Sequence, residues 1–172
     1  MTIVDASIRD TEIDDRLGLG YGIEAYLGAR VVLDGATLDG NGEYGILVAG
    51  EGTLATLSRT CIGHTSPGRS DLGVGLQVQQ QALGTVVDSE FSDNIGYGAS
   101  ARTGGMLRLQ SSKCSRNVFG GVASGGEGAS LAMVGGEIVV TVGVELDGTG
   151  VGALAFDGGA LSLHDVSLAR NS

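Results

Sequence analysis

The residue types that most readily do chemistry, cysteine and histidine, are few and widely spaced. They are Cys61, Cys114, His64 and His164, and none of them forms a C-x-x-C or H-E-x-x-H spacing. Structural and catalytic zinc sites need ligands clustered in such patterns. The sequence therefore predicts no zinc site. Cys61 is predicted to be a free thiol rather than a nucleophile.

Carboxylates gather in one segment near the N-terminus, which contains Asp10, Glu12, Asp14 and Asp15. An oxygen-rich loop of this kind suits Ca²⁺. The calcium-binding nonapeptide G-G-x-G-x-D is absent. A solvated acidic loop is the favoured interpretation, Ca²⁺ is the alternative, and no other cofactor is predicted.

The elements that must position these residues are short strands and tight corners. Gly accounts for 32 of 172 residues, Pro occurs once, and 42% of the chain is hydrophobic, which argues against a disordered or collagen-like chain. The formal charge of −10 disfavours nucleic acid and anionic lipid as partners, because both require a basic surface. No apolar run is long enough to span a membrane, and the N-terminus does not resemble a signal peptide.

An internal repeat organises the whole chain. Its clearest copies run from Val86 to Gly105 and from Leu109 to Gly128. We call the inward residue before each polar turn the anchor of its copy. The anchors are Ile8, Leu38, Ile62, Phe91, Cys114, Ile138 and Leu168, at spacings of 30, 24, 29, 23, 24 and 30 residues. The residues five and seven positions before each anchor are nearly all apolar, as expected of stacked inward positions.

Glycine recurs at two further points of the repeat. One column of glycines precedes a third short strand with alternating apolar residues, and a second column follows that strand at Gly28, Gly52, Gln81, Gly104, Gly128 and Gly158. Glycine at five of six equivalent corners predicts positive φ there. All length variation is predicted to lie between the anchor and the next glycine. The short turns carry Asn three residues past the anchor, at Asn41, Asn94 and Asn117, and the long ones carry Thr11, Thr65 and Thr141.

These features resemble the right-handed parallel β-helix proteins of the pectate-lyase-like superfamily. The phrases SIRDT, GYGIEA and GVASGGEG are most similar to Gly-rich β-helix repeats of myxobacterial surface proteins. The predicted fold is all-β: a right-handed, single-stranded parallel β-helix of six to seven coils of 23–30 residues, with three short parallel sheets. Residues 1–172 form one such domain, predicted to be a segment of a longer solenoid. Its uncapped end coils are expected to permit end-to-end self-association.

In this fold the two cysteines cannot pair. Cys114 is an anchor and should face inward, whereas Cys61 precedes an anchor and should face outward. They lie two coils apart, about 10 Å, which exceeds the reach of a disulfide. His64 and His164 are about four coils apart and cannot share a metal.

The resemblance raises the question of a carbohydrate-active site, because enzymes of this superfamily cluster Asp with Ca²⁺ and a basic residue on one sheet. The columns two past and three before the anchor place no Asp residues in consecutive coils, so they do not supply the carboxylate pair that glycoside cleavage needs. Three of the four tyrosines, Tyr21, Tyr44 and Tyr97, precede the coil glycine. Long loops on the third and sixth coils are expected to flank a shallow cleft. The candidate ligand face is Asp93, Asn94, Tyr97, Arg116, Asn117, Phe119 and Tyr44.

The favoured function is a non-catalytic structural or adhesive module of a larger secreted or cell-surface protein. Its candidate partner is a glycan, such as a polysaccharide, or a protein at the cell surface, bound through loops on one edge. The aromatic rings could instead pack over the turns without binding anything. A polysaccharide lyase or glycoside hydrolase is the alternative function, and an excised scaffold fragment is the third. Localisation would be extracellular or at the cell surface if the chain belongs to a longer exported protein. Fold alone does not choose among these functions.

Overall fold

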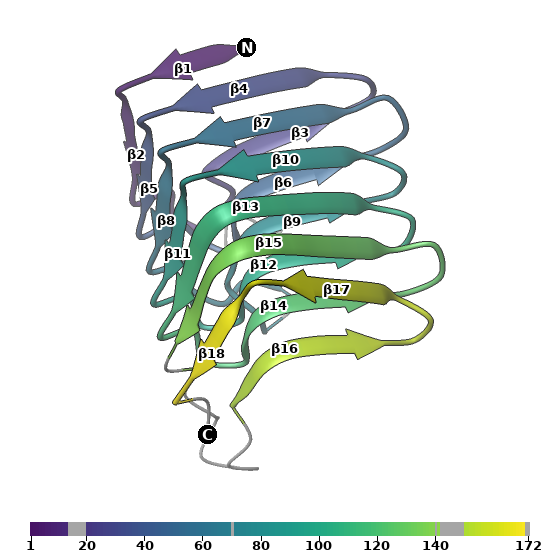
Figure 1. The fold of residues 1–172 in the computed structure, drawn as a ribbon. Helices are drawn as coiled ribbons and strands as arrows, with labels where there is room; N and C mark the ends of the chain where they lie inside the picture. The colour runs from purple at the N-terminus through teal and green to yellow at the C-terminus, as the bar shows by residue number, and fades with distance from the viewer. Residues whose placement is uncertain (14–19, 70, 140, 142–149, 171–172) are drawn as a thin grey trace.

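A computed structural model describes residues 1–13, 20–69, 71–139, 141 and 150–170. The described chain is a right-handed parallel β-helix in which each coil passes through three strand-forming faces, and successive coils stack along one axis (Figure 1). Among these residues, no helix is long and apolar enough to cross a bilayer.

The strands form three faces. The first face contains β1 (Thr2–Val4), β4 (Arg30–Asp34), β7 (Leu54–Ser58), β10 (Leu83–Val87), the beginnings of β13 (Met106–Ser115) and β15 (Ser130–Val139), and β17 (Ala160–His164). The second contains β2 (Ser7–Arg9), β5 (Thr37–Asp39), β8 (Cys61–Gly63), β11 (Glu90–Ser92), the ends of β13 and β15, and β18 (Ser167–Ala169). The third contains β3 (Ile23–Tyr26), β6 (Tyr44–Ala49), β9 (Val74–Gln79), β12 (Tyr97–Arg102), β14 (Gly120–Gly125) and β16 (Val151–Phe156).

The prediction of three short parallel sheets needs one correction. Strands β13 and β15 continue around the bend between the first two faces, so these faces form a single 12-stranded sheet. The third face is a separate six-stranded sheet. In Figure 1 it lies behind the first face and closes the solenoid.

The register confirms the alignment of the repeat. Each anchor pairs with the anchor of the next coil, from Ile8 with Leu38 through to Ile138 with Leu168. The residues five positions earlier pair in the same way. Inward side chains of successive coils therefore stack into one core, in which Phe91 and Leu57 have no exposed surface. Apolar burial along this stack is the main stabilising contribution.

The corners between strands contain residues whose backbone adopts the left-handed conformation, with positive φ. Positive φ at the second glycine column is confirmed, including Gln81 at 65°. The positions three before and two past the anchor are also corners with positive φ. Asp5, Asp88 and Asp165 occupy the first of these columns, and Asp10 and Asp93 occupy the second. Asp is among the non-glycine residues that tolerate this conformation best. Asp is therefore explained at these positions by backbone geometry.

The glycine column predicted to precede the third strand lies inside it, as the second residue of β9 and β12, and glycine is required there for a different reason. A Cβ atom added at Gly75 would lie 2.5 Å from the carbonyl oxygen of Gly98, and one at Gly98 would lie 2.8 Å from that of Gly121. Real Cβ atoms do not approach a backbone oxygen so closely. The absence of a side chain thus allows the backbones of neighbouring coils to approach each other closely at the start of these strands.

Length also varies at a second place, contrary to the prediction. The corner between the third and first faces has four residues between Ala49 and Leu54, and between Gly125 and Ser130, but three between Gln79 and Leu83. The extra residues are Glu51 and Glu127, each in a turn between strands. Side chains there line an open hollow of about 510 Å³.

Candidate ligand-binding site

The structure divides the predicted ligand face into three groups of residues. Asn94 and Asn117 are fully buried, so their inclusion in a ligand face was wrong. Asp93 and Arg116 lie on an exposed ridge along the turns. Tyr44, Tyr97 and Phe119 lie where the strands of the six-stranded sheet begin, and each is half-buried.

The buried asparagines connect neighbouring coils. Asn117 Oδ1 accepts hydrogen bonds from the backbone N–H of Asn94 at 3.1 Å and from its Nδ2 at 2.9 Å. Asn117 Nδ2 in turn donates to the carbonyl oxygen of Phe91 at 3.0 Å. The asparagines do not themselves adopt positive φ; the residue before each one does. Their amides are used to satisfy buried backbone groups.

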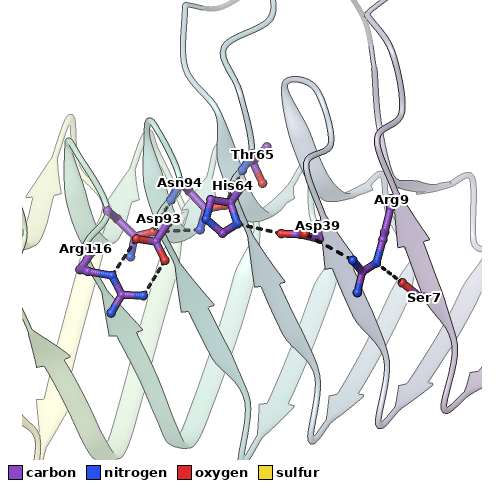
Figure 2. A network of polar contacts seen from close by, with 9 residues as sticks. Ser7, Arg9, Asp39, His64, Thr65, Asp93, Asn94 and Arg116 are labelled. Carbon is purple, nitrogen blue, oxygen red and sulfur yellow. Dashed lines mark hydrogen bonds and ion pairs between the residues drawn. The ribbon is translucent and has the colours of Figure 1, made fainter.

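The exposed ridge consists of Arg9, Asp39, His64, Asp93 and Arg116, one residue from each of five successive coils (Figure 2). Asp39 Oδ1 lies 2.8 Å from His64 Nδ1, and Asp39 Oδ2 lies 4.0 Å from Arg9 Nη1. Arg116 donates to both carboxylate oxygens of Asp93, at 2.7 and 2.6 Å. These side chains therefore form two groups along the turns, one of Arg9, Asp39 and His64 and one of Asp93 and Arg116.

Ion pairing on this ridge lowers the pKa of one carboxyl group, that of Asp93. The hydrogen bonds from Arg116 hold the pKa of Asp93 below its usual range, against the opposing effect of partial burial, and the charges of Arg116 and His64 act in the same direction. Asp93 is therefore ionised at neutral pH and already bound to a cation. An incoming ligand that needed either partner would have to displace the other.

A second surface, which we call the aromatic face, is the outer side of the six-stranded sheet together with the edge where its strands begin. The chain has four tyrosines and three phenylalanines. All of them except the core residue Phe91 belong to this face: Tyr21, Tyr26, Tyr44, Tyr97, Phe119 and Phe156. Tyr21 packs edge-on against Tyr44, with ring centroids 5.3 Å apart, and Tyr97 lies 6.4 Å from Phe119.

Small residues form the middle of the aromatic face. Ser100 and Ala123 alternate with core residues along their strands, so they lie on the outer side of the sheet, yet both are buried. Larger side chains lie over two glycines of the strand that contains Ala123. A Cβ added at Gly125 would lie 2.3 Å from the ring of Phe156, and one at Gly120 would lie 2.8 Å from the ring of Tyr97. The rings thus lie across neighbouring coils where glycine leaves room.

A pocket of about 210 Å³ opens on this face between Tyr44 and Tyr97. Val74, Gln77, Gln79 and Arg102 also line it. The Arg102 guanidinium stacks on the ring of Phe156, 4.7 Å from its centroid. Burial raises the pKa of Tyr97, and the positive charge of Arg102 opposes that shift. The pocket therefore combines aromatic walls, amide groups and one cation.

Sequence reasoning missed Gln77, Gln79, Arg102 and Phe156. They occupy outward positions of third-face strands, where a polar residue in the sequence is usually interpreted as solvent-exposed. The sequence pattern that could have identified them is a long side chain at an outward position of one coil that pairs with glycine or serine in the next coil, as Arg102 pairs with Gly125 and Gln77 with Ser100. It also missed Asp39, which lies one position before the left-handed corner and reaches His64 in the next coil.

The remaining candidate residues show no metal site. No group of three or more His, Cys, Asp or Glu in the described part of the chain is placed to hold a metal ion. Asp14 and Asp15 of the acidic loop, and the long loop of the sixth coil at 142–149, lie outside the described residues. Both cysteines are free, with Cys61 exposed and Cys114 buried as predicted. Burial raises the pKa of the Cys114 thiol to about 12, so it is an unreactive core residue.

Comparisons with known proteins identify no family: no protein-family model matches the chain, and no curated protein matches it. A similar solved structure is the periplasmic alginate epimerase AlgG. The two chains are 18% identical with a TM-score of 0.49, and the match covers 97% of this chain and 50% of the other. The chain thus spans half the length of that structure.

Proposed function

We propose that this β-helix is a non-catalytic structural module that binds a glycan on its aromatic face. The observation that carries the proposal is the concentration on this face of every aromatic side chain except Phe91. Two of them, Tyr44 and Tyr97, line a pocket together with two amides and an arginine. Exposed aromatic surface beside a few polar groups is typical of small-molecule and sugar sites.

The ridge supports a structural role better than a binding role. Arg116 and Asp93 use their charges on each other, and Asp39 holds both His64 and Arg9. By contrast, no carboxylate in the described residues pairs with Arg102. The aromatic face therefore offers a cationic side chain, Arg102, that has no carboxylate partner among the described residues and can contact a ligand.

A direct test is affinity electrophoresis of the chain in gels that contain neutral or acidic polysaccharides. Retardation in at least one gel is expected, and Tyr97→Ala should weaken it by tenfold or more through the loss of ring contact. Met106→Ala is the matched control, since Met106 is a large exposed residue on the first face. Absence of retardation in every gel, or equal loss in both variants, would overturn the proposal.

One observation favours the alternative of a lyase or hydrolase. Asp39 orients the His64 imidazole through Nδ1, which leaves Nε2 for proton transfer, with Asp93 and Arg116 in the next two coils. We expect no unsaturated product from uronate polymers with Ca²⁺ present, measured by ultraviolet absorbance. Product formation that His64→Gln or Arg116→Ala abolishes would establish the enzyme instead.

A further inference from the structure

The pocket between Tyr44 and Tyr97 is small. Its volume of about 210 Å³ is less than the range of about 300–1,000 Å³ typical of drug-sized ligands. One six-membered ring fills such a space, and a longer chain would have to leave it. If a glycan binds on this face, the pocket therefore holds one unit of it.

The amides in the pocket are oriented by each other. Gln77 Nε2 donates to Gln79 Oε1 at 2.7 Å, and Gln77 Oε1 accepts from the Ser100 hydroxyl at 3.2 Å. Because the oxygen of Gln79 is engaged in this way, its Nε2 remains as a donor. No hydrogen bond among the described residues uses that Nε2 group.

Arg102 gives the pocket a second donor. Its guanidinium carries N–H groups and no acceptor. Arg59 and Arg116 each form a two-pronged pair with an Asp from the preceding coil, Asp34 and Asp93. Arg102 instead stacks on Phe156, and its charge acts on the phenol of Tyr97. Its N–H groups pair with no carboxylate in the part of the chain that the structure describes.

We propose that this pocket is a hydrogen-bond-donor site for a single sugar unit that carries a carboxylate or acyl oxygen on its ring. The inference rests on the proposed function and adds to it the class of substituent recognised. A carboxylate or acetamido oxygen only accepts hydrogen bonds, which matches Gln79 Nε2 and Arg102. A hydroxyl at the same place would form weaker hydrogen bonds with these two donors, because it is uncharged and its own O–H would need an acceptor.

The inference is tested with matched monosaccharides in the gluco and galacto series: the parent hexose, its uronate and its N-acetylhexosamine. Binding is followed by amide chemical-shift titration into the millimolar range. At least one substituted sugar should bind tenfold or more tightly than its parent hexose. Selectivity for the uronate alone identifies the carboxylate, and selectivity for the N-acetyl sugar alone identifies the acyl oxygen.

The variants test the donors themselves. Arg102→Gln should remove selectivity for a uronate, and Gln79→Glu, which replaces the donor by an acceptor, should remove selectivity in either case. Arg108→Gln is the matched control, because Arg108 is exposed on the first face outside this pocket. Equal affinity for all three sugars, or selectivity that survives both pocket variants, overturns this inference.

The two proposals fail in different ways. Polysaccharide retardation that depends on Tyr97 but shows no preference for a substituent leaves the glycan-binding proposal intact and removes only the donor site. Absence of any Tyr97-dependent retardation removes the glycan-binding proposal, and absence of monosaccharide binding in the titration removes the donor site.

Discussion

Two adjacent columns of the turn differ completely in what their side chains do. Asp93 and Arg116 point outward on the ridge, whereas Asn94 and Asn117, one residue later in each coil, are buried. Asp93 and Arg116 form an ion pair in contact with water, and such a pair contributes little to stability. The buried pair satisfies backbone groups that water cannot reach, where a lost partner is costly. Stability of the turn is therefore expected to come from the buried column.

The largest effect should come from Asn117→Ala. This change leaves the backbone N–H and Nδ2 of Asn94 and the carbonyl of Phe91 without their partner. We expect the free energy of unfolding in urea to fall by about 3 kcal/mol.

Asn41→Ala is the matched control within the same column. Asn41 is equally buried, but its Nδ2 has no hydrogen-bond partner, and its Oδ1 serves Thr11. Its loss should cost about 1 kcal/mol. Equal losses in the two variants would show that volume, rather than hydrogen bonding, decides stability in this column.

A gain of stability is expected from Thr65→Asn. Asn41 Nδ2 and Thr65 Oγ1 are both buried without a partner in neighbouring coils. An amide oxygen at position 65 would accept a hydrogen bond from Asn41 Nδ2, as Asn117 Oδ1 accepts one from Asn94 Nδ2. The midpoint of urea unfolding should rise by an amount equivalent to about 1 kcal/mol.

Thr11→Asn provides the comparison for that gain. The Thr11 hydroxyl already donates to the carbonyl of Gly20 at 2.9 Å and lies 2.9 Å from Asn41 Oδ1. Replacement there should bring no gain. A stabilised Thr11→Asn variant, or a destabilised Thr65→Asn variant, would contradict this prediction. It would mean that the unpaired Asn41 Nδ2 and Thr65 Oγ1 groups do not lower the stability of the turn.

The repeat predicted the fold because its inward positions are apolar at fixed spacing, so the sequence alone places Ile62 and Leu57 in the core. It did not predict which polar residues are buried. Asn suits a turn whether its amide faces water or the next coil, so Asn94 gave no sign of its buried bonds. Arg102 was missed because its partner, Phe156, lies two coils away on the same face. Such contacts depend on intervening residues, here Gly125, that lack a side chain.

The smallest effect is expected from the ridge, in Arg116→Ala. Because Arg116 lowers the folded-state pKa of Asp93, the pair contributes stability above the ordinary carboxyl pKa of about 3.9. That contribution disappears as the pH falls through the lower folded-state value. At pH 7 the variant should lose about 0.5 kcal/mol, and the difference from the parent chain should vanish in strong acid. Urea unfolding at both pH values measures this, with exposed Arg108→Ala as the control. A loss as large as that of Asn117→Ala would mean that the exposed column, and not only the buried one, holds the coils together.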